Sequence, residues 1–190
     1  GDIIYKDMNG DGFIDGADQW RIGKNSFPRG NYGIYANLSY KGFSANILFQ
    51  GATSRDMYIE DVVRGQSTGG YTMVYPYQLD YWMPDNTDAK FPRIAMNSSV
   101  NGNNNYVTSD FWLVNGRYIR LKSLQLGYDF RSVLLKNIKW LYKCQVVLSG
   151  QNLFTISPAT KYGFDPENGS TNNYDYPMQR VYAISLNLGF

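Results

Sequence analysis

Residues near the start of the chain have the types and spacing of a calcium-binding loop. Such a loop places oxygen-bearing side chains at positions 1, 3, 5, 9 and 12 and a backbone carbonyl at position 7. The candidate ligands are Asp7, Asn9, Asp11, Phe13, Asp15 and Asp18. Position 12 is an aspartate and no helix clearly precedes the loop, so the sequence predicts an isolated loop with a structural Ca²⁺ rather than an EF-hand. The alternative is a metal-free turn rich in Asn, Gly and Asp.

Catalytic chemistry has little support in the sequence. The 190-residue chain has no histidine and one cysteine, which excludes Ser-His-Asp and Cys-His catalysis and the usual zinc ligand sets. A glycosidase would need two carboxylates, and no motif singles out a pair among the candidates. These candidates are Asp80, Asp85, Asp88 and Asp110. We therefore expect no enzyme activity. The net charge of +2, with scattered Lys and Arg, gives no reason to expect a nucleic-acid partner.

The last stretch of the chain alternates between large apolar residues and small or polar ones. The apolar set is Tyr182, Ile184, Leu186, Leu188 and Phe190, and the other set is Val181, Ala183, Ser185, Asn187 and Gly189. Side chains alternate across a strand, so this pattern predicts a strand with one apolar and one wettable face. Such a strand fits a soluble β-sandwich or a membrane barrel with lipid on one side.

Four more strands are predicted upstream. Residues 34–40 and 43–49 alternate in the same way around Lys41-Gly42, which predicts a hairpin. Residues 115–130 form a long strand whose apolar phase slips by one position, so a bulge is expected near Lys122-Ser123. Residues 143–151 alternate again. Residues 55–64 are a candidate short helix, and residues 133–135 a candidate helical turn.

The connections between these strands alternate in length. Long ones cover residues 1–31, 52–115 and 152–179, and short ones lie at Lys41-Gly42 and 131–141. This sorting is typical of outer-membrane barrels, and no apolar run approaches the ~20 residues of a membrane helix. The predicted fold is all-β, with about five C-terminal strands of a large antiparallel transmembrane β-barrel, long extracellular loops and short periplasmic turns. An open edge cannot face lipid, so other sequence or another chain must complete the barrel.

Short motifs occur in a fixed order along the chain. They are GDIIYKDMNGDG at 1–12, IG at 22–23, YKGF at 40–43, FQG at 49–51, RYIRLK at 117–122, LGY at 126–128, SGQNLFT at 149–155, DPE at 165–167 and the terminal Phe190. Their order and rough spacing resemble the C-terminal end of SusC/RagA-type TonB-linked outer-membrane proteins. The corresponding division is residues 1–31 as an extracellular loop with the calcium motif and residues 32–190 as C-terminal barrel strands and loops.

The resemblance implies active import of oligosaccharides or peptides across the bacterial outer membrane. It implies a plugged barrel of about 22 strands, surrounded by outer-membrane lipid, driven by the TonB complex and capped by a SusD-like lipoprotein lid. The C-terminus would face the periplasm, with Phe190 resembling the barrel-assembly signal.

Aromatic and amide side chains of the long loop are the candidate substrate contacts by chemistry and position. They are Tyr75, Tyr77, Tyr81, Trp82, Asn104 and Tyr106. The alternative function is a secreted, calcium-stabilised β-sandwich that binds carbohydrate. It explains the aromatic residues and the calcium motif, but not the sorting of the loops.

Overall fold

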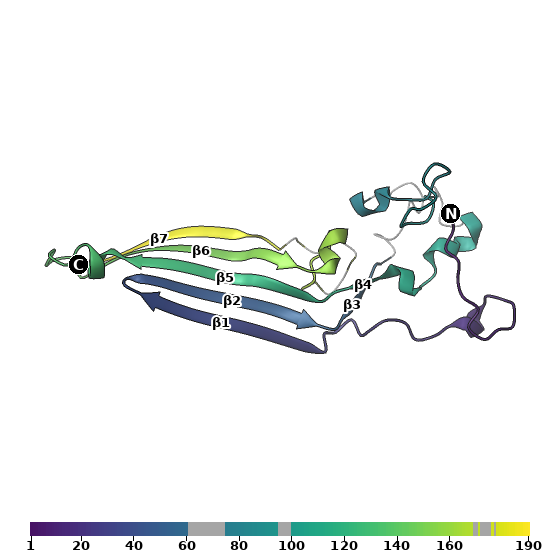
Figure 1. The fold of residues 1–190 in the computed structure, drawn as a ribbon, viewed down its shortest axis with the longest axis horizontal. Helices are drawn as coiled ribbons and strands as arrows, with labels where there is room; N and C mark the ends of the chain where they lie inside the picture. The colour runs from purple at the N-terminus through teal and green to yellow at the C-terminus, as the bar shows by residue number, and fades with distance from the viewer. Residues whose placement is uncertain (61–74, 95–99, 169–170, 172–175, 177) are drawn as a thin grey trace.

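Five long strands form one open antiparallel sheet (Figure 1). The structure is a computed structural model that describes the chain except residues 61–74, 95–99, 169–170, 172–175 and 177. The sheet order is β1 (Gly30–Tyr40), β2 (Phe43–Thr53), β5 (Tyr118–Asp129), β6 (Lys143–Ile156) and β7 (Val181–Gly189). The predicted set of five antiparallel strands is confirmed.

The connection between β1 and β2 is the tight turn that the sequence predicts. Lys41 and Gly42 both have positive φ, 44° and 87°. Two successive residues with positive φ give a turn whose twist matches that of the flanking strands. The register runs without interruption from the Tyr40–Phe43 pair to the Gly30–Thr53 pair, so the predicted hairpin is confirmed.

The predicted bulge in the long strand is also confirmed. Leu121 pairs with Phe49 on β2, whereas Ser123 pairs with Leu48, so Lys122 is an extra residue on β5. The register with β6 shifts at the same place, where Asn152 adopts a positive φ of 52°. The extra residue shifts the alternation of the side chains that follow it. Arg120 and Lys122 lie on the same side, because both contact Glu167.

A second, two-stranded sheet is inserted between β2 and β5. It pairs β3 (Asp56–Tyr58) with β4 (Leu113–Asn115). The helix expected over residues 55–64 is therefore wrong where residues are described, because the local segment finds a distant strand partner. Its remainder, from residue 61, lies outside the described residues. The strand expected over residues 115–130 is also split, into the end of β4 and β5.

Helical structure in the described residues is short. The segments are η1 (Gly16–Asp18), η2 (Pro76–Leu79), η3 (Val100–Tyr106), η4 (Asp110–Trp112), α2 (Phe130–Val133) and η5 (Pro158–Tyr162). Helix α2 begins before the predicted turn at 133–135 because the Asp129 side chain accepts hydrogen bonds from the amides of Arg131 and Ser132. In the part of the chain that the structure describes, no helix has the length and apolar character needed to cross a membrane.

The two ends of the sheet carry different kinds of connection (Figure 1). The β1–β2 turn, helix α2 and the C-terminus lie at one end, which we name the short-connection end. The N-terminal segment, β3, β4 and the 3₁₀ helices lie at the other end. The main buried core is found there and not on the sheet; its residues are Met57, Ile59, Trp112, Val114, Ala159 and Phe164. We name this group of segments, residues 55–59, 75–94, 103–116 and 157–168, the loop module.

Candidate functional site: two sheet faces and a loop module

One face of the sheet is apolar and exposed. Directly paired residues of an antiparallel sheet share a face, and the register aligns one apolar row across all five strands. The row is Leu38, Ala45, Leu126, Leu148 and Ile184. Its large members are open to the outside, and Ile184 is 74% exposed. An apolar area of this extent marks contact with another apolar surface.

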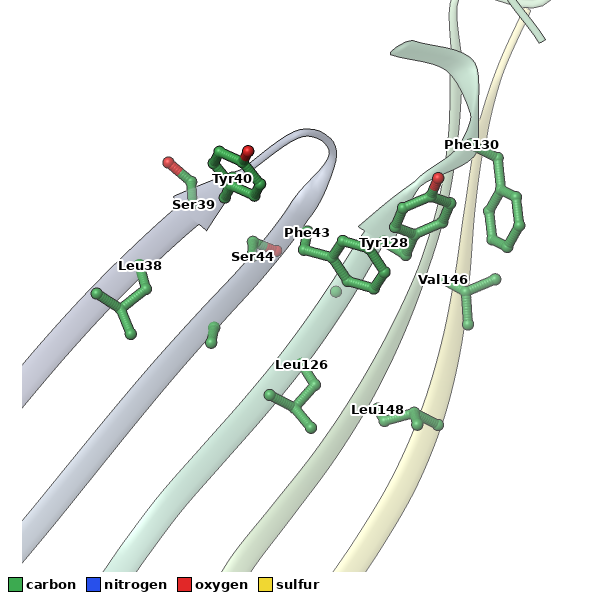
Figure 2. A pocket seen from close by; sticks show the side chains of 12 residues that line it. Leu38, Ser39, Tyr40, Phe43, Ser44, Leu126, Tyr128, Phe130, Val146 and Leu148 are labelled. Atoms are coloured by element: carbon green, nitrogen blue, oxygen red, sulfur yellow. The ribbon is translucent and has the colours of Figure 1, made fainter. Parts of the chain in front are cut away.

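Aromatic rings border this apolar face at the short-connection end. Tyr40, Phe43, Tyr128 and Phe130 surround a groove of about 560 Å³, with leucines further along the strands (Figure 2). The ring centroids of Phe43 and Tyr128 are 4.4 Å apart, and those of Tyr128 and Phe130 are 4.7 Å apart. Aromatic side chains of this kind favour the boundary between an apolar and a polar medium.

Another aromatic residue lies toward the other end of the apolar face. The Tyr32 ring covers Gly51 so closely that an added Cβ would lie 2.2 Å from it, and its hydroxyl donates to the Tyr118 carbonyl at 3.1 Å. At ~3.4 Å per residue, the strand path from Tyr32 to Tyr40 is about 27 Å. Barrel strands are tilted by ~35–45°, so this path corresponds to a height of about 19–22 Å, close to the ~25 Å apolar band of a membrane barrel.

The opposite face of the sheet is polar. The Asn37 amide donates to the Asn46 side-chain carbonyl at 2.7 Å, and the Asn46 amide donates to Gln125 at 3.4 Å. These bonds join β1, β2 and β5 in one ladder of neutral amides. Ser149 continues the row on β6, opposite Gln125. Such a surface favours contact with water or with a hydrogen-bonding ligand.

A charged cluster joins the sheet to the β6–β7 connection. Nη2 of Arg120 lies 2.7 and 2.8 Å from the two carboxylate oxygens of Asp165, and its Nε donates to Thr155 at 2.7 Å. Nζ of Lys122 lies 2.8 Å from Glu167, which also pairs with Arg120 at 3.1 Å. The Arg120 side chain is only 3% exposed. We name Arg120, Lys122, Asp165 and Glu167 the charged cluster.

Arg55 holds the same connection through backbone carbonyls. Its guanidinium donates to the carbonyls of Pro166 and Asn168 at 2.8 and 3.2 Å. Burial lowers the pKa of Arg55 from its ordinary value, although a guanidinium remains protonated at neutral pH. The β6–β7 connection is thus fixed both to the sheet and to the loop module.

The N-terminal segment is bound to the loop module. The Arg93 guanidinium contacts both oxygens of Asp2, at 2.7 and 3.1 Å, and the Asn105 side chain donates to the same carboxylate at 2.8 Å. Asn105 also accepts a bond from the Ile3 amide, while Asn104 donates to the Ile3 carbonyl, each at 2.8 Å. The hydrogen bond from Arg93 lowers the pKa of Asp2.

The predicted metal ligands form a closed loop whose carboxylates accept backbone amides. Asp7 accepts from the Gly10 and Gly12 amides at 2.5 and 2.8 Å. Asp18 accepts from Met8 at 2.7 Å and from Asp15 at 2.9 Å, and these bonds, the one from Asp15 first, lower its pKa. Among the described residues, no three acidic, His or Cys side chains gather as a metal site. The Ca²⁺ assignment to Asp7, Asn9, Asp11, Phe13, Asp15 and Asp18 stays a prediction.

The predicted substrate contacts pack largely within the loop module. The Tyr75 and Tyr77 rings stack at 6.0 Å, and Tyr77 also meets Phe164 at 6.2 Å. Tyr106 is 8% exposed. Trp82 covers Gly1 so closely that an added Cβ would lie 2.4 Å from its ring.

Tyr81 is half-buried and forms an isolated β-bridge with Phe91. The Asn104 side chain donates a hydrogen bond to the Ile3 carbonyl. The structure therefore brings Tyr75 and Tyr77 together and shows packing partners for the others. The role of these six residues in substrate contact stays a prediction.

The charged cluster was not found by sequence reasoning. Its members lie in two of the quoted motifs, RYIRLK and DPE, but neither motif says that the two segments touch. A signal was present, because one cation lies in the predicted bulge and another two residues before it, and two carboxylates flank Pro166. Opposite charges on segments predicted to be strand and loop would have justified testing their pairing.

Comparison with known proteins shows relatives along the whole chain. No family model matches. The chain is 29% identical to TonB-dependent receptor P39 and 28% identical to TonB-dependent receptor P3, both of Formosa agariphila, over all of this chain and 19% of each relative. It is 26% identical to TonB-dependent receptor SusC of Bacteroides thetaiotaomicron, over 98% of this chain and 17% of that protein.

Solved structures show the same fold. The RagAB peptide importer in its closed-closed state matches 95% of this chain and 20% of that chain, with a TM-score of 0.66 and 23% identity. Its open-open state matches with a TM-score of 0.63 and 23% identity, over 94% of this chain and 19% of that chain. The open sheet is therefore part of a large antiparallel β-barrel, as the sequence predicts.

The relatives confirm the resemblance to TonB-dependent receptors of the SusC/RagA type. The chain spans about a fifth of the length of the curated relatives it matches.

Proposed function

We propose that this chain forms barrel wall in an outer-membrane transporter that imports oligomeric nutrients, either oligosaccharides or peptides. The observation that carries the proposal is the opposite polarity of the two sheet faces. The apolar face would contact outer-membrane lipid, and the amide ladder of Asn37, Asn46 and Gln125 would line the interior. The short-connection end, with the C-terminus, would face the periplasm.

The proposed function involves binding and passage and no covalent chemistry. Neutral amides on the interior wall would exchange hydrogen bonds with hydroxyl or peptide groups of a passing substrate without holding it by charge. The aromatic candidates of the loop module would add stacking surfaces at the outer opening. The charged cluster and Arg55 would keep the β6–β7 connection from moving into the passage. Movement of the connection would leave the buried guanidinium groups of Arg120 and Arg55 without their hydrogen-bond partners.

The partners follow from the relatives and remain part of the proposal. A SusD-like lipoprotein would cover the opening formed by the loop module. The TonB complex would act through parts of the transporter outside this chain. Ca²⁺ would be structural, holding the loop at Asp7–Asp18 so that residues 1–5 stay bound to the loop module.

The β-sandwich alternative has less support. A sandwich needs a second sheet over the apolar face, and in the described residues the second sheet, β3 with β4, has only three residues in each strand. The row that includes Leu38, Leu126 and Ile184 stays uncovered by it.

Fractionation of cells that make the full-length protein tests the proposal. The protein should be recovered in the outer membrane, require detergent for extraction, and migrate faster on a gel before heating than after. Recovery of a monomeric protein from the soluble fraction without detergent would contradict the proposal. Uptake of labelled oligosaccharides and of labelled peptides, compared with a deletion strain, then distinguishes the two substrate classes.

A further inference from the structure

Three cationic residues line a pocket on the rim of the sheet, at the end opposite the short-connection end. Lys24 comes from the N-terminal segment, Arg117 from the corner between β4 and β5, and Lys161 from η5. The pocket has a volume of about 680 Å³, within the ~300–1,000 Å³ of typical small-molecule sites. Three segments that are distant in sequence thus each contribute a cationic residue to the lining of one pocket.

These cations have no anionic partner among the described residues. No ion pair joins Lys24, Arg117 or Lys161 to a carboxylate there, and no acidic residue lines the pocket. Asp56 is the nearby acid, and it accepts one hydrogen bond from the backbone amide of Lys24. Uncompensated positive charge in a concave site favours an anionic ligand, because like charges otherwise repel one another.

The same pocket is continuous with the apolar face. Tyr32 and Ile119 line it, together with Ile156. The register puts these three in one row, through the pairs Tyr32–Gly51, Gly51–Ile119 and Ile119–Ile156. Ile156 is 65% exposed. One part of the site is therefore cationic. The other part is apolar and is continuous with the exposed apolar rows of the sheet.

We propose that this pocket binds the phosphorylated headgroup of a membrane glycolipid, the lipid A part of lipopolysaccharide, with its acyl chains along the apolar face. Phosphates accept charge-assisted hydrogen bonds from lysine and arginine. A free phosphate would use only the cations, whereas a phosphorylated lipid uses both parts of the site. The inference depends on the proposed function, because it needs this rim to lie at the outer leaflet.

Binding of purified lipid A to the full-length transporter in detergent tests the inference. The triple variant Lys24→Gln, Arg117→Gln, Lys161→Gln should bind diphosphorylated lipid A on the order of 100-fold more weakly, at about 5-fold per cation. The wild-type protein should bind the dephosphorylated lipid as weakly as the triple variant binds the phosphorylated one. Inorganic phosphate at millimolar concentration should not compete with the lipid.

Two control variants keep the result interpretable. Lys136→Gln, Lys139→Gln, Lys143→Gln removes three exposed lysines from the short-connection end and should bind lipid A as the wild type does. Lys24→Arg, Arg117→Lys, Lys161→Arg keeps the charges and should retain binding within a few-fold. Heat-modifiable migration of each variant shows that the barrel is folded.

Several outcomes would overturn the inference. Equal binding by the two glutamine variants, binding unaffected by removal of the phosphates, or full displacement by inorganic phosphate would each do so. If the protein is embedded in the membrane but gives any of these results, only the lipid site is refuted and the proposed function stands. If the protein is soluble, both the lipid site and the proposed function are refuted.

Discussion

Arg120 on β5 and Asp165 in the β6–β7 connection form an ion pair in which one guanidinium nitrogen lies 2.7 and 2.8 Å from the two carboxylate oxygens. The Arg120 side chain is 3% exposed and the Asp165 side chain 17% exposed. Removing one partner of a pair this shielded from water is strongly destabilising, because it leaves the other charge buried and uncompensated. Arg120 is therefore the more buried of the two sheet residues, with Lys122, that hold the β6–β7 connection through ion pairs.

Replacing Arg120 tests its part in holding the connection. Arg120→Gln should lower the free energy of unfolding by about 3 kcal/mol, since Asp165 and Glu167 lose their shared cation. Limited proteolysis of the full-length protein should then cut within residues 157–180. Lys90→Gln is the control, because Lys90 lies 3.6 Å from Asp80 with its side chain 82% exposed, and such pairs contribute ~0–1 kcal/mol. Equal protease resistance in the two variants would show that the charged cluster does not fix the connection.

Calcium binding is expected at the loop near the N-terminus. Calorimetric titration of the full-length protein should show one Ca²⁺ bound per chain at this loop. Asp7→Asn and Asp11→Asn should each weaken the affinity at least about ten-fold, since each removes a negative charge from the ligand set. Asp85→Asn, an exposed acid outside the loop, should leave the affinity unchanged. An unaltered titration in both loop variants would refute the ligand assignment.

The contact between Asp2 and Arg93 should be sensitive to acid. The hydrogen bond from Arg93 lowers the pKa of Asp2 from its ordinary 3.8. The stabilisation from this contact is therefore fully present above pH 3.8. It is lost as the pH falls below that value and through the lowered pKa of Asp2. The Trp82 ring covers Gly1, so its fluorescence reports release of this segment. The fluorescence should change below pH 4 in the wild-type protein, and this change should be absent from Trp82→Phe. Asp2→Asn should show the released fluorescence already at neutral pH.

The two sheet faces are tested by one pair of adjacent residues. Leu124 pairs with Ile47 on the apolar face, and Gln125 pairs with Asn46 on the polar face. Leu124→Arg should destabilise the folded protein in lipid vesicles by about 2–4 kcal/mol, the cost of a cation near the centre of the bilayer. Gln125→Arg should cost far less. Similar losses in urea titrations of both variants would mean that the apolar face does not meet lipid.

Phe190 tests the predicted barrel-assembly signal. Its ring stacks on Trp140 with centroids 5.6 Å apart, so packing and signalling must be separated. Phe190→Ala should reduce the fraction of heat-modifiable protein in the outer membrane severalfold. Trp140→Ala removes the same ring contact and keeps the terminal residue, so it should assemble normally. Loss of assembly in both variants would assign the effect to packing.

The long strands could be predicted because their information is local. Alternation with a period of two, the Lys41-Gly42 turn and the phase slip at Lys122 are each visible in a few neighbouring residues. The pairing of β3 with β4 is different, since its partners are more than fifty residues apart in the sequence and only three residues long. Short segments follow their tertiary partners rather than their own propensity, and the expected helix was wrong over its described residues for that reason.

The candidate site was predictable in part. Oxygen ligands at a fixed spacing and aromatic residues in a long loop are recognisable by type alone. Contacts between segments are not, and the charged cluster, Arg55 and the pocket at Lys24, Arg117 and Lys161 are all of this kind. Each joins side chains whose proximity is created by the sheet register and by the folded loop module.

The outer edges of the sheet have a consequence for the chain in isolation. Within the described residues, β1 and β7 each pair on one side only, so each presents a row of unused amide and carbonyl groups. Such rows are templates for β-augmentation. The two edges belong to the same chain, so one copy can add its β7 to the β1 of the next, and the contact can repeat from copy to copy. Without strands that pair with these edges, the 190-residue chain should self-associate edge to edge, and short peptides that match either edge should limit this association.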